Sequence, residues 1–460
     1  MEYTELSAYD VPPGVVTTWV PIADQSAWLR DDRGLSPDQE AHLGGGDTGA
    51  WIGSVMRIPH RFDAPTLRAA LVAWIDRHEA LRSDVVADAD GGGWTRRIVP
   101  ARAVDIESTE IGWLGAGHSQ RWIQDFFATV SPLRWPHLLF ATVADPERDD
   151  FVLAFGADHS VMDAYSQLLW FEEFAGLYER AAAGATAAEL IVFEVGSHVD
   201  HSERERAIAA ALDESSAPVA RWLEFLGEGK AFPRFPVPID LDGRITLPQT
   251  SISVWLAGAE QTERLGAVCR DLGTSMQSGL LASVSVAFRE AFGIDRLRYV
   301  LPMHTRASAE HTAAVGWYVG LAPIDIDITG IEQVDDLVAA VHAATGQGKD
   351  LVHFPFPRIA ELGGIQDRPH FAISYVDTRF VPGADRWDEW AARALRSTSY
   401  AGDEIYFWFI RTREGLNVSA RYPATLAAER AVRALLDRVG HHLHVMGKAS
   451  AADMALPTAG

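Results

Sequence analysis

Apolar residues spaced three and four positions apart predict an amphipathic helix over residues 63–83. Leu67 and Leu71 belong to its apolar stripe, which continues to the end of the segment. Asp63 supplies a side chain that can cap the first turn, and Pro65 suits the first helical position. We expect this helix to bury one face against a sheet.

Two apolar runs further along predict a pair of strands. Residues 137–143 and 151–157 are almost wholly apolar, and the charged stretch between them has turn character. This pattern is typical of a β-hairpin. A helix is predicted next, over residues 166–182, because its large apolar residues follow helical spacing.

The remaining pattern mixes strands and helices to the end of the chain. A helical stretch covers 203–226, strands are predicted at 251–256, 298–302, 320–328, 371–376, 404–411 and 416–422, and helices at 260–272, 276–292 and 425–446. Such a mixture favours an α/β or α+β fold. The first 50 residues show no clear period and predict an irregular arm. A turn between two strands is expected at Gly91–Gly93.

A proline-rich stretch divides the chain. Residues 232–249 hold four prolines, which rule out a helix there. We therefore predict an N-terminal lobe over 1–231, a linker over 232–250 and a C-terminal lobe over 251–460.

Composition narrows the class of protein. The 460 residues are 48% hydrophobic and carry a net charge of −23, which disfavours binding to nucleic acid. Cys269 is the one cysteine and cannot form an internal disulfide, as fits a reducing compartment. We see neither a signal peptide nor an apolar stretch that could cross a bilayer. The sequence therefore predicts a soluble, cytoplasmic protein.

The clearest candidate for chemistry follows the strand at 151–157. His159 and Asp163 stand there in a loop that leads into the next helix. Histidine suits proton transfer near neutral pH. At this spacing the carboxylate could face the histidine, or it could brace the loop by pairing with an arginine. Alone, the pattern also fits a structural histidine.

A metal site is a weaker alternative elsewhere. His198, Asp200, His201 and Glu205 have the types and spacing of metal ligands, but nothing in the sequence completes such a site. A solvated helix entry explains the four residues better, and we predict no metal.

Three further segments give the histidine its context. They are 77–83 (Arg-His-Glu-Ala-Leu-Arg-Ser), 301–306 (Leu-Pro-Met-His-Thr-Arg) and 315–320 (Val-Gly-Trp-Tyr-Val-Gly). In this order the set resembles the condensation domains of nonribosomal peptide synthetases and their stand-alone acyltransferase relatives. The block around His159 corresponds to the His-His-x-x-x-Asp-Gly motif of that superfamily.

The resemblance is strongest to the polyketide-associated acyltransferases of mycobacteria and other actinobacteria, which esterify sugars such as trehalose. Segments 11–21, 195–206 and 373–383 look like theirs. Two positions depart from the motif: Asp158 replaces its first histidine and Ala164 replaces its glycine. The Asp-Phe-Gly-Trp-Gly motif of the plant relatives is absent, which favours the bacterial branch.

The resemblance implies two chloramphenicol-acetyltransferase-like lobes that meet in a V, with a tunnel at their interface. It implies that His159 is the general base and that Asp163 is a brace, for which Arg306 is the candidate partner. Three side chains are candidates for lining the channel: Ser374, His304 and Trp317. No cofactor is implied, since the acyl thioester of coenzyme A or of a phosphopantetheinyl carrier protein is a substrate.

Three functions stay open at this stage. The first is acyl transfer from a thioester to a hydroxyl acceptor, such as a sugar or another metabolite alcohol, with an acyl carrier protein or polyketide synthase as a possible partner. The second is a free-standing condensation enzyme that joins carrier-bound substrates through an amide or ester. The third is a non-catalytic module that recruits a carrier protein.

Overall fold

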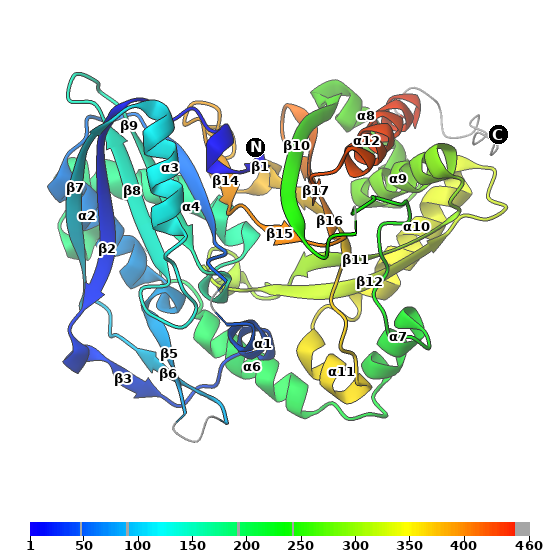
Figure 1. Cartoon of the computed structure of the whole chain (residues 1–460), viewed down its shortest axis with the longest axis horizontal. Helices are drawn as coiled ribbons and strands as arrows, with labels where there is room; N and C mark the ends of the chain where they lie inside the picture. Colours follow the sequence, from blue (N-terminus) through cyan, green and yellow to red (C-terminus); the bar gives the residue numbers. More distant parts are fainter. Residues whose placement is uncertain (47, 89–91, 191–193, 242, 447–460) are drawn as a thin grey trace.

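Two seven-stranded sheets form the centres of two halves that lie side by side (Figure 1). The computed structural model describes residues 1–46, 48–88, 92–190, 194–241 and 243–446. Both sheets are mixed and both carry helices, as the sequence predicted.

The first sheet is antiparallel except at one edge. Its strands are β1 (Tyr3–Thr4), β2 (Gly14–Ala23), β4 (Ile52–Ile58), β7 (Val104–Leu114), β8 (Leu138–Ala144), β9 (Phe151–Ala157) and β14 (Arg393–Arg396). They are ordered β1-β14-β4-β9-β8-β2-β7, and only β1 and β14 run parallel. A small separate sheet holds β3 (Leu29–Asp31), β5 (Ser83–Ala87) and β6 (Trp94–Ile98).

Helices cover both faces of the first sheet. The helices of this half are α1 (Pro37–Gly44), α2 (Ala64–Arg77), α3 (Ala116–Phe127), α4 (Ala164–Ala182), α5 (Ala187–Leu190) and α6 (His198–Ala210). One core cluster joins α2 and α4 through Trp74 and Trp170 to Phe155 of β9. A second cluster packs Phe127 of α3 against the other side. The sheet is therefore buried on both faces, which explains why β8 and β9 are apolar throughout.

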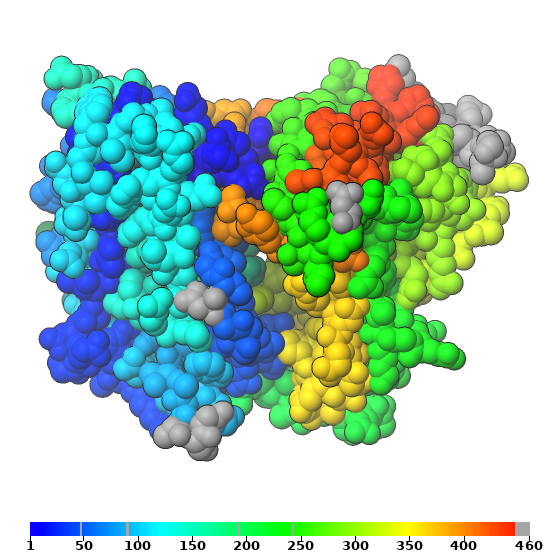
Figure 2. Space-filling view, in the orientation of Figure 1, coloured from blue at the N-terminus to red at the C-terminus, as the bar shows by residue number. Residues whose placement is uncertain are grey.

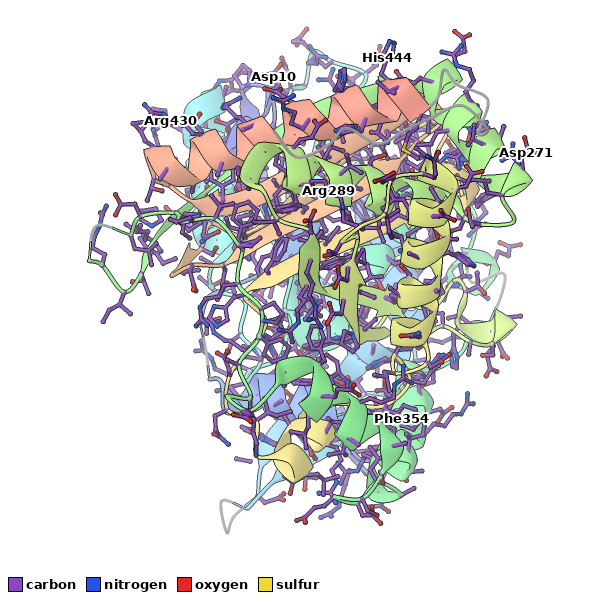
Figure 3. All side chains as sticks on the ribbon, turned by 90° about the vertical axis from the view of Figure 1, so that its right-hand side faces the viewer. Asp10, Asp271, Arg289, Phe354, Arg430 and His444 are labelled. Atoms are coloured by element: carbon purple, nitrogen blue, oxygen red, sulfur yellow. The ribbon has the colours of Figure 1, made fainter. Side chains whose placement is uncertain are left out.

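The second sheet has one face covered by helices. Its strands are β10 (Leu247–Gly258), β11 (Arg296–His304), β12 (Val319–Asp327), β13 (Phe371–Asp377), β15 (Tyr400–Ala401), β16 (Ile405–Arg411) and β17 (Gly415–Pro423), ordered β12-β11-β13-β16-β17-β10-β15. The helices of this half are α7 (Ala217–Leu226), α8 (Ala259–Asp271), α9 (Met276–Phe292), α10 (Val334–Lys349), α11 (Phe356–Gly363) and α12 (Leu426–Met446). Figure 3 shows α12 on the outside, with Arg430 and His444 on its exposed side, and Arg289 of α9 in the interior.

The uncovered face of the second sheet meets the first half. Val376 of β13 and Trp408 of β16 pack against the core of the first half, while their neighbours in the strands face the helices of the second. β14 also crosses over and pairs with β4, although it comes late in the chain.

α7, which precedes the predicted linker, packs against α11 of the second half. The division of the chain at 232–250 stays a prediction.

Several predicted elements are confirmed and others need correction. β9 and α9 have the predicted bounds. The predicted irregular arm is wrong, because it contains β2, a ten-residue strand inside the first sheet, whose apolar residues are interrupted by Thr and Pro. The helix at 63–83 ends at Arg77, since His78 takes an extended conformation. The stretch at 203–226 forms two helices, α6 and α7, separated by a turn.

Two smaller points complete the comparison. β5 and β6 pair antiparallel on either side of the glycine turn, but Gly91 lies outside the described residues. Among the described residues, no helix is both long and apolar enough to span a bilayer.

Candidate active site

Two consecutive caps shape the loop that carries His159. Asp158 ends β9 and accepts a hydrogen bond from the Ser160 N–H at 2.8 Å, which starts a short 3₁₀ turn over His159–Val161. Asp163 then caps α4 by accepting from the N–H of Ser166 at 2.7 Å. The loop is therefore pinned at both ends. Ala164 begins the helix with ordinary helical geometry, so the glycine of the family motif is not required here.

His159 presents a neutral imidazole where the two halves meet. Its side chain is half-buried, and its ring centroid lies 4.3 Å from that of Trp317 of the second half. Burial, followed by the charge of His42, lowers the pKa of His159 below its usual range. A neutral imidazole at physiological pH can accept a proton.

The two ring nitrogens of His159 have no hydrogen-bond partner in another described residue. Nδ1 is enclosed by the protein. No neighbouring residue in the described part of the chain holds this nitrogen.

Asp163 is occupied by partners other than His159. Its carboxylate is fully buried and forms a two-pronged ion pair with Arg306, with Nη1–Oδ2 at 2.7 Å and Nη2–Oδ1 at 3.0 Å. It also accepts from Ser166 and from the backbone N–H of Tyr318. Burial acts to raise the pKa of Asp163, but Arg306 and the hydrogen bonds outweigh it and hold the pKa below its ordinary value. The carboxylate is thus a charged anchor between the halves.

Arg306 is held as firmly as its partner. Its guanidinium lies between the rings of Tyr165 and Tyr318, at 5.0 and 4.5 Å from their centroids. It also donates to the Ala314 carbonyl at 3.2 Å. Only a few per cent of the side chain is exposed, so this contact belongs to the interior of the interface.

The segment 315–319 is fixed beside the loop from several sides. His198 of α6 holds the Trp317 carbonyl through Nε2 at 2.9 Å, and the N–H of Val315 donates to Nδ1 of His78 at 3.3 Å. Gly316 lies so close to His198 that an added Cβ would come within 2.5 Å of its Cβ. Trp317 is thereby placed against His159.

Comparison with known proteins assigns this arrangement to a family. Residues 43–379 match the family model described as the condensation domain, which is more than half of the chain. This chain belongs to the condensation-domain family. The matched span includes the His159 loop, Arg306 and the segment 315–319.

Named relatives agree with the family. The chain is 26% identical to acyltransferase PapA3 of Mycobacterium tuberculosis over 330 residues, which are 70% of this chain and 68% of the relative. It is 25% identical to trehalose-2-sulfate acyltransferase PapA2 of the same organism over 385 residues, 82% of this chain and 80% of the relative.

Solved structures agree on the fold. The structure of the PapA2 acyl transferase superposes with a TM-score of 0.86 at 21% identity, covering 98% of this chain and all of that one. The epimerization domain of tyrocidine synthetase B gives a TM-score of 0.70 at 16% identity, covering 94% of this chain and 99% of that one. The family, the named relatives and the two-lobed fold together make this condensation-domain protein an acyltransferase.

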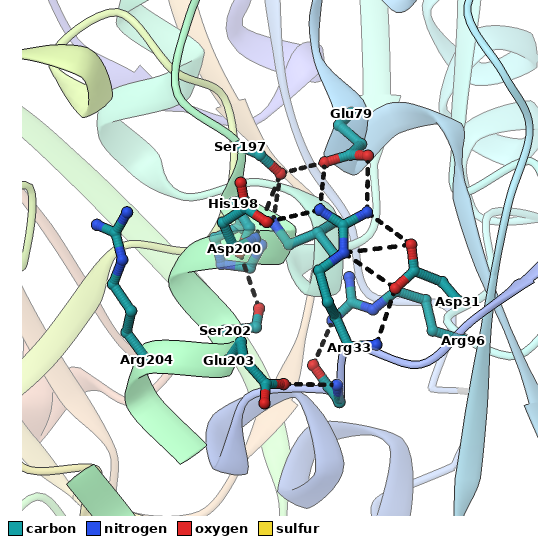
Figure 4. Close-up of polar contacts among 12 residues, drawn as sticks. Asp31, Arg33, Glu79, Arg96, Ser197, His198, Asp200, Ser202, Glu203 and Arg204 are labelled. Carbon is teal, nitrogen blue, oxygen red and sulfur yellow. Dashed lines mark hydrogen bonds and ion pairs between the residues drawn. The ribbon is translucent and has the colours of Figure 1, made fainter. Parts of the chain in front are cut away.

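The segment 77–83 links several elements of the first half through ion pairs. Arg77 and His78 both contact Glu173 of α4, at 2.9 and 3.0 Å. Glu79 binds Arg33, which also pairs with Asp31 and Asp200 (Figure 4). This cluster of charges joins β3, the turn after α2 and the start of α6, and α6 in turn carries His198.

The three channel candidates occupy different positions. Trp317 touches the ring of His159 directly. Ser374 lies on the face of β13 that also carries Val376, and therefore faces the first half. His304 is exposed at the end of β11, with its ring centroid 6.2 Å from that of Tyr165. Figure 2 shows the surface hollowed between the halves, with a narrow opening near the centre of this face.

The four residues considered as metal ligands do not converge. Asp200 accepts a hydrogen bond from Arg33, and His198 contacts the Trp317 carbonyl. His201 contacts Glu205 and Thr305. The described residues contain no group of three or more His, Cys, Asp or Glu side chains arranged for a metal ion.

Sequence reasoning missed one residue near His159. His42 of α1 contacts both carboxylate oxygens of Asp158, at 3.0 and 3.2 Å. Its ring also lies against Trp317, with centroids 5.5 Å apart. Only the unusual Asp158 could have indicated a charged partner, and nothing in the sequence pointed to residue 42.

Proposed function

We propose that this acyltransferase moves an acyl group from a thioester to the hydroxyl of a sugar or a related alcohol, with His159 as the general base. The observation that carries the proposal is the neutral, half-buried imidazole at the junction of the halves. Asp163, the other polar residue of the motif, is committed to Arg306 and not to a relay.

The proposed reaction needs no covalent enzyme intermediate. The free Nε2 of His159 takes the proton of the acceptor hydroxyl as its oxygen attacks the thioester carbonyl carbon. When the tetrahedral intermediate collapses, the carbon–sulfur bond breaks, and the imidazolium returns the proton to the departing sulfur. Well-placed proton transfer of this kind contributes about 10²–10⁴-fold to the rate. Holding donor and acceptor between two lobes adds to it.

The substrates are proposed from the relatives. The name of PapA2 specifies trehalose-2-sulfate as its acceptor, and this supports a sugar hydroxyl as the acceptor here. The donor is an acyl-coenzyme A or a carrier-protein thioester, the latter with a polyketide synthase as partner. A cytoplasmic location suits such thioesters and the single free thiol of Cys269.

The test is a product screen by mass spectrometry. The purified chain is incubated with acyl-coenzyme A donors of increasing chain length, together with trehalose, trehalose-2-sulfate or an amino acid ester. We expect a sugar ester with at least one donor and release of coenzyme A in equal amount. Amide formation alone would favour the condensation enzyme. Absence of every product, also with acyl carrier-protein donors, would favour the recruitment module.

A further inference from the structure

An ion pair stands where the family motif has its first histidine. Asp158 is 2% exposed, and the ring of His42 reaches it from α1, a separate element of the chain. Hydrogen bonds from His42 and from Ser160, the latter through both its side chain and its backbone, hold the pKa of Asp158 below its ordinary value against the effect of burial. The carboxylate is therefore charged at neutral pH, with the His42 ring as its contact.

This pair lies close to the proposed base. Trp317 contacts the rings of both His42 and His159, with centroids 5.5 and 4.3 Å apart. The charge of His42 disfavours a proton on His159, whereas the charge of Asp158 favours it. With both present, the two influences oppose each other.

We propose that His42 and Asp158 form a positioning unit that keeps His159 in its neutral, proton-accepting form and seated against Trp317. The inference rests on the proposed role of His159 as the base. It gives a function to the departure from the family motif: the aspartate at position 158 acquires a histidine partner from α1.

Asp163 is another charged group that acts on His159, and it has its own counter-ion. Asp163 favours a proton on His159, but its own charge is matched by Arg306. If His42 is removed, the buried carboxylate of Asp158 loses its partner. Its charge then favours a proton on His159 without opposition from His42.

Another carboxylate lies in the same helix as His42. Asp38 lies one turn earlier in α1, and burial, followed by the charge of Glu205 of α6, raises its pKa to about 8. It is therefore uncharged at pH 6–7. Asp158 is therefore the charged carboxylate that the His42 ring contacts.

The test follows the titration of His159 itself. The protein is labelled with ¹³C-histidine, and the ring signal of His159 is assigned from its loss in His159→Ala. We expect His42→Gln to move the titration midpoint of His159 up by about one pH unit, since an unpaired carboxylate favours the imidazolium. In His42→Gln/Asp158→Asn, which removes both charges, the midpoint should return to within about 0.3 units of the native value. Asp158→Asn alone should not raise it.

A control and a second assay separate the possible failures. Glu40→Gln removes a charge from the same helix, but this carboxylate pairs with Arg206, so the midpoint should not move. An unchanged midpoint in His42→Gln, or a raised one in the double variant or in Asp158→Asn, would overturn the positioning unit. Turnover of acyl-coenzyme A and acceptor by His159→Ala tests the proposed function separately, because it does not depend on His42.

Discussion

At the scale of single residues, Asp163 connects the loop that carries His159 to the second half. Five hydrogen bonds reach its carboxylate, from Ser166, Arg306 and Tyr318. The family resemblance implied Arg306 as the partner of Asp163, and the two side chains are in contact at 2.7 Å. A buried pair of this kind positions groups more than it adds net stability.

Removing Asp163 should therefore be costly. Asp163→Ala leaves Arg306 buried without a counter-charge and should lower the free energy of unfolding by about 3–5 kcal/mol. Chemical denaturation of both proteins measures this. Glu260→Ala, which breaks the exposed pair with Arg264, is the control and should cost about 1 kcal/mol or less. Equal effects of the two substitutions would contradict the brace.

Some residues of the candidate site could be predicted from the sequence and others could not. The motif drew attention to His159 and Asp163 because they stand four positions apart after a strong strand. His42 is 116 positions from Asp158 in the chain, and α1 itself was not predicted. A contact between two such distant segments depends on the packing of the whole half.

At the scale of elements, the segment 315–319 depends on a close backbone contact. Gly316→Ala places a Cβ within 2.5 Å of the His198 Cβ and should cost about 1–3 kcal/mol in stability. Because Trp317 is the next residue, the rate of acyl transfer should fall as well. Thermal melts and turnover assays measure both effects.

Gly176→Ala is the matched control for this substitution. Gly176 lies in α4 with open space around its Cβ position, so alanine there should be neutral or stabilising by up to about 1 kcal/mol. If Gly316→Ala were as stable and as active as Gly176→Ala, the close packing of this segment would not matter.

The charge cluster around Arg33 should make the stability of the protein depend on pH. Its hydrogen bonds lower the pKa of Asp31 below its ordinary value of 3.8. A lowered folded pKa gives stability that is complete above the unfolded pKa and is lost as pH falls through the folded one. Arg33→Ala should therefore lower the melting temperature by about 1–3 °C at pH 6, and the difference from the native protein should shrink below about pH 4. A difference that grows toward pH 3 would contradict this linkage.

Periodicity located most elements of the second half but fewer of the first: β4, β7 and α3 were not predicted, nor were α10 and α11 of the second half. Runs that are apolar throughout, such as β9 and α9, were found with their bounds. β2 was missed because Thr and Pro interrupt its apolar residues, although the sheet buries it. The four-residue β14 was missed because its partners β4 and β1 lie more than 300 positions earlier in the chain.

At the scale of the whole molecule, strands and ion pairs cross between the halves. β14 belongs to the first sheet but leads back into the second, and Tyr3 of β1 packs on Trp408. Arg306 and Asp163 add a charged link. The halves should therefore lose their structure together and not as independent units.

Calorimetry tests this coupling. We expect one cooperative transition, with tryptophan fluorescence and circular dichroism changing at the same temperature. Asp163→Ala and Gly316→Ala, which weaken the junction, should broaden or split the transition. Two well-separated transitions in the native protein would show that the junction contributes little.

The central claim concerns His159 as the base of an acyltransferase, and His159→Ala tests it most directly. The measurement is turnover of the acyl thioester and its acceptor by the native protein and the variant, beside a thermal melt of each. His444→Ala is the matched control, since His444 is an exposed histidine on the outer side of α12. The account predicts that His159→Ala melts like the native protein and is slower by about 10²-fold or more, while His444→Ala keeps most of its activity. Full turnover by a folded His159→Ala protein would contradict it.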